Sequence, residues 1–227
     1  MYRTLLLDLD HTLFNTDASE QAAFEQTMLA AGVPAATAWF KTYQRINLEL
    51  WSAMERGELQ SGLIRNLRFE RFVVECNLDA SPRQMADDFV AGLGAFGDLY
   101  DGARAVLEQL SRRVPMALVT NGFGEVQRSR IARLGLDEYF DAVAISAELG
   151  TAKPDPGIFD FVFEALGSPP RETAVMVGDN LSADIAGGAN YGIATCWYNP
   201  HGRTPDPALA INHEISDLQE LLALAAH

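Results

Sequence analysis

The chain has 227 residues, of which 48% are hydrophobic and 21% charged. This length fits one large domain, or a core with a smaller inserted domain. The net charge of −14 argues against a nucleic-acid or anionic-membrane surface, because such surfaces depend on clustered lysine and arginine. The sequence contains neither a signal-peptide pattern nor an apolar run of about 18 residues. We expect a cytoplasmic protein without nucleic-acid or membrane partners; monomer and homodimer both remain open.

The first apolar run, Thr4 to Leu7, ends at two aspartates, Asp8 and Asp10. A run this short is typical of a buried parallel strand. Buried carboxylates are costly unless they are paired, hydrogen-bonded or bound to metal. The end of this strand therefore predicts a site for a cation or polar ligand.

Residues 15–97 show helical periodicity and no strand pattern. Helices are expected over about 17–31, 38–56, 61–75 and 82–93. The sequence thus predicts an all-helical cap domain over 15–97, inserted into a catalytic core formed by residues 1–14 and 98–227.

Apolar runs and helical segments alternate in residues 98–227. The runs are 115–119, 142–145, 174–177 and 193–197. A short helix is expected over 183–189, and Ser216 with Gln219 is expected to cap a final helix. Such alternation predicts an α/β fold with a parallel sheet, and right-handed crossovers give a Rossmann-like three-layer sandwich.

Polar residues stand where these runs end. Asp8 and Asp10 follow the first run, Thr120 and Asn121 the second, and Asp179 the fourth. The carboxyl ends of parallel strands meet in one crevice, where ligands bind. We expect these side chains to lie together although they are far apart in sequence.

Carboxylates gathered in one crevice repel one another unless a divalent cation lies between them. An all-oxygen set with few carboxylates suits Mg²⁺, which shares its coordination with a substrate phosphate. The sequence also offers groups that suit an anion: the Thr120 hydroxyl, a lone lysine at Lys153, and the N–H groups after Asn121 and Asn180. Together they indicate phosphoryl transfer through an aspartyl-phosphate, with Asp10 positioned to move a proton.

Four motifs occur in order along the chain: Asp8-x-Asp10-x-Thr12, Thr120-Asn121-Gly122, Lys153-Pro154 and Gly178-Asp179-x4-Asp184. In this order they resemble the haloacid dehalogenase-like (HAD) phosphohydrolases, and the resemblance covers the whole chain. It implies the same core, a helical cap and a bound Mg²⁺. His11 is a departure, because many members carry glycine at that position.

The resemblance implies a role for each matched residue. Asp8 is similar to the nucleophile and Asp10 to the general acid/base. The metal ligands would be Asp8, the Asp10 carbonyl and Asp179. The phosphate would be bound by Thr120, Asn121 and Lys153, with Asp184 and Asn180 in supporting positions.

Further segments look like bacterial pyrimidine 5′-nucleotidases of this superfamily, among them Thr195-Cys196-Trp197-x-Asn199. This implies a small-molecule substrate such as UMP, dUMP, dTMP or modified analogues. Tyr43, Asn47 and Trp51 share one helix face by their spacing. That face is either core packing or a wall against which the base stacks.

Other functions remain open on the sequence. A sugar-phosphate or other small phosphomonoester phosphatase has the same motifs. A dehalogenase or phosphonatase of the superfamily does not need Asp10, and Lys41 is the one candidate for a phosphonatase lysine. A non-enzymatic binding protein has no need of the set formed by Asp8, Asp10, Lys153 and Asp179.

Overall fold

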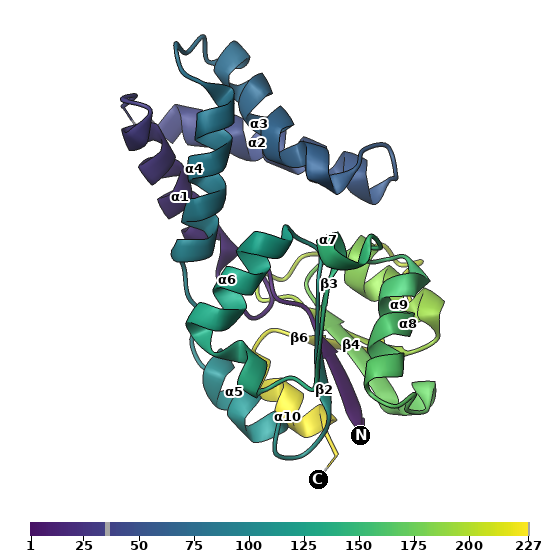
Figure 1. Cartoon of the computed structure of the whole chain (residues 1–227). Helices are drawn as coiled ribbons and strands as arrows, with labels where there is room; N and C mark the ends of the chain where they lie inside the picture. The colour runs from purple at the N-terminus through teal and green to yellow at the C-terminus, as the bar shows by residue number, and fades with distance from the viewer. Residues whose placement is uncertain (35–36, 227) are drawn as a thin grey trace. The chain divides into compact units, whose positions relative to one another are not determined.

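The computed structural model describes residues 1–34 and 37–226, and its contacts divide the chain into two compact units (Figure 1). The core unit comprises Met1–Asn15, Asp98–Gly124 and Ile131–His227. The helical unit comprises Thr16–Gly97 and Glu125–Arg130. This division lies close to the predicted one but gives Glu125–Arg130, which we expected in the core, to the helical unit. That the units are separate domains stays a prediction.

The sheet of the core unit contains six parallel strands in the order β3-β2-β1-β4-β5-β6. Their bounds are β1 (Thr4–Leu7), β2 (Met116–Thr120), β3 (Ala142–Ile145), β4 (Ala174–Gly178), β5 (Ala194–Tyr198) and β6 (His213–Ile215). In the central strand, Leu6 pairs with Ala117 on one side and Met176 on the other. The predicted parallel sheet is confirmed, with β6 as an extra strand; its three residues include two polar ones and form no apolar run.

Helices cover both faces of this sheet (Figure 1). Leu5 and Leu7 belong to one apolar cluster and Leu6 to another, because successive side chains of a strand point to opposite faces. The first cluster includes residues of α5 (Ala103–Leu110), the end of α6 (Gly124–Leu134) and α10 (Leu221–Leu224); the second includes residues of α8 (Pro156–Ala165) and α9 (Ala186–Tyr191). The three-layer architecture is therefore confirmed.

All regular structure among the described residues of the helical unit is helical. Its main helices are α1 (Thr16–Ala30), α2 (Thr37–Glu55), α3 (Ser61–Glu75) and α4 (Pro82–Ala95). Ser81 caps α4, because its side chain accepts a hydrogen bond from the Gln84 N–H at 3.3 Å. Each of these helices contributes an aromatic ring to the interior of the unit: Phe24, Tyr43, Phe69 and Phe89.

Two local predictions in the core unit were wrong. The C-terminal capping box is formed by Asp217 and Glu220 rather than by Ser216 and Gln219. The Asp217 carboxylate accepts from the Gln219 N–H at 2.8 Å, and the Glu220 carboxylate accepts from the Asp217 N–H at 3.0 Å. Two overlapping capping patterns compete here, and the structure uses the one with two charged acceptors. A 3-10 turn, Leu218–Glu220, then precedes the four residues of α10.

The other difference concerns the expected helix over 183–189, which begins instead as a π-helical turn, Leu181–Ile185. A short helix that we did not expect, α7 (Ser146–Leu149), follows β3.

The two ends of the chain lie beside each other (Figure 1). The Tyr2 N–H donates to the Leu224 carbonyl, and the Ala226 N–H donates to the Tyr2 carbonyl, both at 2.7 Å. None of the helices in the described part of the chain has the length and apolar character needed to cross a membrane.

Candidate active site

The strand order reverses direction at the neighbouring strands β1 and β4, and this is where ligands bind in open parallel sheets. Asp8 follows β1, and its N–H donates to the Val177 carbonyl of β4 at 2.9 Å. Asp179 directly follows β4. The sheet pairing therefore brings together two carboxylates that are 171 positions apart in the sequence.

The turn after β1 connects these two residues through Thr12, which is fully buried. The Thr12 hydroxyl donates to Asp8 Oδ2 at 2.9 Å and accepts from the Asp179 N–H at 3.1 Å. His11 has a φ of 60° in the same turn. The left-handed conformation explains why glycine is favoured at this position, and histidine is among the residues that tolerate it.

Lys153 lies at the centre of the site with only 2% of its surface exposed. Its Nζ lies 2.6 Å from Asp8 Oδ1, 2.7 Å from Asp184 Oδ1 and 2.6 Å from the Val119 carbonyl. The ammonium group therefore has three close oxygen neighbours. A lysine so deeply buried is found only where its charge is compensated, which the two carboxylates do here.

Asn121 holds the main chain of this lysine. Its Oδ1 accepts from the Lys153 N–H at 2.9 Å, and its Nδ2 donates to the Lys153 carbonyl at 2.8 Å. Thr120, the last residue of β2, is fully buried. The side chain of Asn121 thus positions the lysine, and a direct role of Asn121 and Thr120 in phosphate binding stays a prediction.

The π-helical turn after β4 carries Asp184, which is 1% exposed. Asn180 caps this turn, because its side chain accepts from the N–H groups of Ser182 and Ala183, each at 2.9 Å. The Asn180 N–H donates to Asp184 Oδ2 at 3.0 Å. Asn180 and Asp184, the two residues that were predicted to support the site, are therefore hydrogen-bonded to each other.

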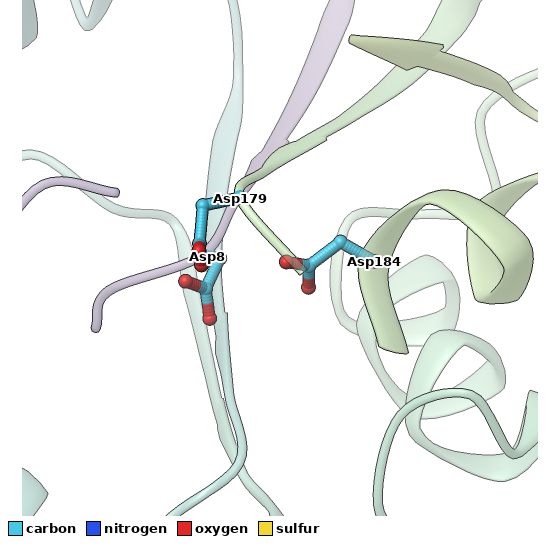
Figure 2. Close-up of side chains that lie close together, drawn as sticks. All are labelled: Asp8, Asp179 and Asp184. Atoms are coloured by element: carbon cyan, nitrogen blue, oxygen red, sulfur yellow. The ribbon is translucent and has the colours of Figure 1, made fainter. Parts of the chain in front are cut away.

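Asp8, Asp179 and Asp184 form an acidic cluster in which one carboxylate oxygen of each lies within 4.8 Å of the others. Figure 2 shows the Asp184 carboxylate directed toward the other two. This set differs from the predicted metal ligands, which included Asp10 through its carbonyl and placed Asp184 outside. The side chain of Asp184 is closer to the centre of the site than we expected.

Burial and mutual repulsion disfavour the ionised forms of these carboxyl groups and raise their pKa values. Burial, followed by the charge of Asp184, raises the pKa of Asp8 to about 7, although Lys153 acts in the opposite direction. Burial and the charge of Asp8 raise the pKa of Asp179 to about 6. Burial would lower the pKa of Lys153, but Asp184 and Asp8 outweigh it and raise the pKa above its usual value. The lysine is therefore a permanent cation in the site.

Three carboxylates around one space form a set of hard oxygen donors, which fits Mg²⁺. A divalent cation would also relieve the repulsion that raises the pKa of both Asp8 and Asp179. Asp10 is half-buried, and its charge also raises the pKa of Asp8. Its main chain forms a bridge with Phe14 that fixes the turn.

The predicted substrate residues of the helical unit lie on α2. Tyr43 is fully buried, with its ring packed against Phe24, Phe69 and Phe89. Asn47 is 7% exposed and donates to Glu20 Oε1 at 2.9 Å. Trp51 is half-buried. The Tyr43 ring thus packs in the interior of the helical unit, and substrate roles for all three residues stay predictions.

Sequence reasoning gave no role to three residues that contact the site. Thr12 joins Asp8 to Asp179, as described above. Trp197 Nε1 donates to the Asp179 carbonyl at 3.0 Å, and Arg203 Nη2 donates to the same carbonyl at 2.7 Å. Thr12 could have been found from its place in the first motif, whereas Trp197 and Arg203 had no signal that linked them to Asp179.

The chain resembles known proteins over most of its length. Residues 2–192 match the family model of the haloacid dehalogenase-like hydrolases. It is 34% identical to the pyrimidine 5′-nucleotidase YjjG of Escherichia coli over 96% of this chain and 95% of that protein. It is also 34% identical to the pyrimidine 5′-nucleotidase PynA of Streptococcus pneumoniae, over 97% of this chain and 94% of that protein.

A crystal structure of the HAD-hydrolase YfnB of Bacillus subtilis, bound to magnesium, superimposes with a TM-score of 0.92. The two chains are 31% identical, and the match covers 98% of each. The predicted resemblance and the prediction of an enzyme are thereby confirmed. This chain belongs to the haloacid dehalogenase-like hydrolases.

Proposed function

We propose that this enzyme is a Mg²⁺-dependent 5′-nucleotidase that dephosphorylates pyrimidine nucleoside monophosphates through an aspartyl-phosphate. Hydrolysis of a phosphomonoester follows from the family and from relatives named for this reaction. The aspartyl-phosphate, the metal and the nucleotide substrate are the proposal. The observation that carries it is the cluster of Asp8, Lys153 and Asp184, with Asp179 alongside, at the carboxyl ends of β1 and β4.

In the first half of the reaction, a carboxylate oxygen of Asp8 attacks phosphorus. The bond from Asp8 to phosphorus forms while the bond from phosphorus to the leaving oxygen breaks, and Asp10 donates a proton to that oxygen. Lys153, which contacts Asp8 at 2.6 Å, faces the negative charge that develops on the phosphoryl oxygens. Thr120 and Asn121 are the other proposed phosphate contacts.

In the second half, Asp10 accepts a proton from water as the water oxygen bonds to phosphorus. The bond from phosphorus to Asp8 breaks, so inorganic phosphate leaves and both carboxylates return to their first state. Asp184 keeps Lys153 in place throughout, because its carboxylate stays 2.7 Å from the ammonium group in the resting enzyme.

Asp8, the Asp10 carbonyl and Asp179 would hold the Mg²⁺, with Asp184 beside them. When bound, the ion neutralises charge on the phosphate and lets it approach the carboxylates. The magnesium bound to YfnB supports this choice of metal for the present chain.

The pyrimidine nucleotide substrate rests on the names of YjjG and PynA. Nucleotide metabolism is thus the proposed setting. A sugar-phosphate or other small phosphomonoester is the alternative, since the residues proposed for the core site act on the phosphoryl group that all these substrates share.

The nucleophile is tested by Asp8→Asn in the hydrolysis of p-nitrophenyl phosphate with Mg²⁺. We expect a loss of at least about 1,000-fold, because an amide oxygen does not form the intermediate. Asp137→Asn, at an exposed aspartate of the core unit, is the matched control and should keep wild-type turnover. Undiminished turnover by Asp8→Asn would refute the role of Asp8, and activity that persists in EDTA would refute the metal.

The substrate class is tested by comparing kcat/KM for UMP, dUMP and dTMP with purine monophosphates and sugar phosphates. We expect the pyrimidine nucleotides to be hydrolysed best. A clear preference for sugar phosphates would establish the alternative and leave the mechanism untouched.

A further inference from the structure

Arg203, in the loop after β5, contacts a member of the acidic cluster at two points. Its Nη2 donates to the Asp179 carbonyl at 2.7 Å and lies 3.4 Å from Asp179 Oδ2. A single guanidinium group therefore contacts both the main chain and the carboxylate of this aspartate.

The loop is built so that Arg203 stays at this place. Asn199, which is 3% exposed, accepts from the Arg203 N–H at 2.8 Å and donates to the Arg203 carbonyl at 2.9 Å. The same Asn199 amide donates to Glu214 of β6 at 2.6 Å, which ties the loop to the edge of the sheet. The main chain of Arg203 is thus held on both sides by one buried side chain.

The side chain of Arg203 is held as well. Its Cζ lies 5.4 Å from the ring centroid of Trp197, a cation–π contact with a fully buried indole. Trp197 donates to the same Asp179 carbonyl at 3.0 Å. That carbonyl therefore accepts two side-chain hydrogen bonds, one from β5 and one from the loop that follows it.

We propose that Arg203 is a positioning residue of the metal site. Arg203 holds the main chain of Asp179, so that the Asp179 carboxylate faces Asp8. The site then binds a divalent cation more tightly than it would without Arg203. This inference rests on the proposed function, in which Asp179 is a ligand of Mg²⁺. It concerns a residue outside the four motifs.

The positive charge of Arg203 acts against cation binding, so two effects compete. The contact with the carbonyl is the shorter one, at 2.7 Å against 3.4 Å for the carboxylate. The Arg203 side chain is 46% exposed, so solvent and salt screen its charge. Positioning therefore outweighs repulsion, and loss of the side chain should weaken binding.

The test measures the Kd of the full-length enzyme for Mg²⁺ by isothermal titration calorimetry, without substrate. Arg203→Ala should raise the Kd about tenfold, the size of effect typical of residues that hold metal ligands. Arg203→Lys should restore part of the affinity, because lysine keeps a positively charged donor but not the guanidinium contact with the Trp197 ring.

Arg171→Ala is the matched control. Arg171 also lies on an aromatic ring, with its Cζ 3.9 Å from the Tyr191 centroid, and donates to the Tyr191 carbonyl at 2.8 Å. Tyr191 does not belong to the acidic cluster. The control should therefore bind Mg²⁺ with the wild-type Kd.

A wild-type or lower Kd for Arg203→Ala would overturn the inference; a lower one would mean that Arg203 acts only as a competing charge. Arg203→Met keeps packing on Trp197 but has no hydrogen-bond donor, so its Kd for Mg²⁺ should also rise about tenfold. If the alanine variant unfolds, the Kd of the methionine variant tests the inference in its place. Absence of Mg²⁺ binding by the wild type would refute both this inference and the proposed metal. An unchanged Kd in the variants, with turnover that depends on Asp8 and Mg²⁺, would refute the inference alone.

Discussion

Gly178, the last residue of β4, lies directly against the Asp184 carboxylate. An ideal Cβ at this position would be 2.1 Å from Asp184 Oδ2 and 2.7 Å from Asp184 Cβ. The distance to Asp184 Cβ matters more, because Asp184 Cβ cannot move unless the main chain of the π-helical turn moves with it. The approach of Asp184 to Lys153 thus depends on the absence of a side chain at residue 178.

We predict that Gly178→Ala displaces Asp184 and breaks its ion pair with Lys153. Loss of one partner of a buried pair should lower the free energy of unfolding by about 3 kcal/mol, and turnover should fall with it. Urea unfolding and phosphatase assays measure the two effects. Gly62→Ala in α3, where a Cβ would meet nothing within 4 Å, is the control and should change stability by less than about 1 kcal/mol. Wild-type stability for Gly178→Ala would contradict the steric argument.

The raised pKa of Asp179, about 6, gives a pH dependence with a definite sign. A carboxyl group whose pKa is higher in the folded than in the unfolded state costs stability when it ionises. The cost is absent below the unfolded pKa of about 4 and fully present above about 6. Without metal, the folded protein therefore carries this cost at neutral pH.

We predict that Asp179→Asn stabilises the protein in EDTA at pH 8 by about 2 kcal/mol, because the amide does not ionise. The gain should shrink as the pH falls from 6 to 4, and Mg²⁺ should stabilise this variant less than the wild type. Thermal unfolding between pH 4 and 8 measures this, with the exposed Asp137→Asn as control. A gain that grew toward low pH would show that burial does not disfavour the ionised form.

At the scale of single elements, one face of helix α2 is buried in the interior of the helical unit. Tyr43 and Asn47 do share a buried face, as their spacing predicted. The Tyr43 hydroxyl accepts from Arg68 Nη1 at 3.4 Å, and its ring is surrounded by phenylalanines of three other helices. The spacing alone did not distinguish packing from substrate contact, because both place the residues on one face.

We predict that Tyr43→Leu lowers the free energy of unfolding by about 2–4 kcal/mol, because it removes a ring from a packed aromatic cluster. Tyr43→Phe keeps the ring and serves as the control, with a cost of about 1 kcal/mol for the hydroxyl. Chemical denaturation of both variants measures these costs. A Tyr43→Leu variant of wild-type stability that has lost only affinity for pyrimidine nucleotides would favour the substrate role instead.

Short apolar runs and their polar ends could be predicted from the sequence, because each is a local pattern. Five of the six strands and the carboxylates Asp8 and Asp179 were found in this way. Strand β6 was missed because His213–Ile215 has only three residues, two of them polar, and its strand neighbour is β5. A local sequence pattern does not show which distant strand a segment will pair with.

The contacts of Asn121 and Arg203 could not be predicted for a related reason. Asn121 reaches the main chain of Lys153, 32 residues away, and Arg203 reaches Asp179 across 24 residues. A polar residue in a loop has many partners within its reach. Only the folded arrangement selects one of them.

At the scale of the whole molecule, the C-terminus is joined to the N-terminus through Tyr2. The two main-chain hydrogen bonds are accompanied by full burial of Ala225. The last residues therefore continue the structure of the core unit.

We predict that deletion of residues 224–227 lowers the free energy of unfolding by about 2 kcal/mol, from two hydrogen bonds and lost apolar burial. Thermal unfolding measures the loss. Ala226→Ser, which keeps the main-chain donor, is the control and should melt close to the wild type. A truncated chain as stable as the wild type would show that the terminal pairing contributes nothing.

The central place of β1 in the sheet also has a consequence for synthesis on the ribosome. β1 is made first, but its neighbours β2 and β4 begin only at Met116 and Ala174. Helices α1 to α4 are complete long before either neighbour exists, and their contacts are closer in sequence. Because distant pairings form slowly, the helical unit should become structured first. β1, which Asp8 follows, therefore has no neighbouring strand until about half of the chain has been made, and its second neighbour is complete only after more than three quarters.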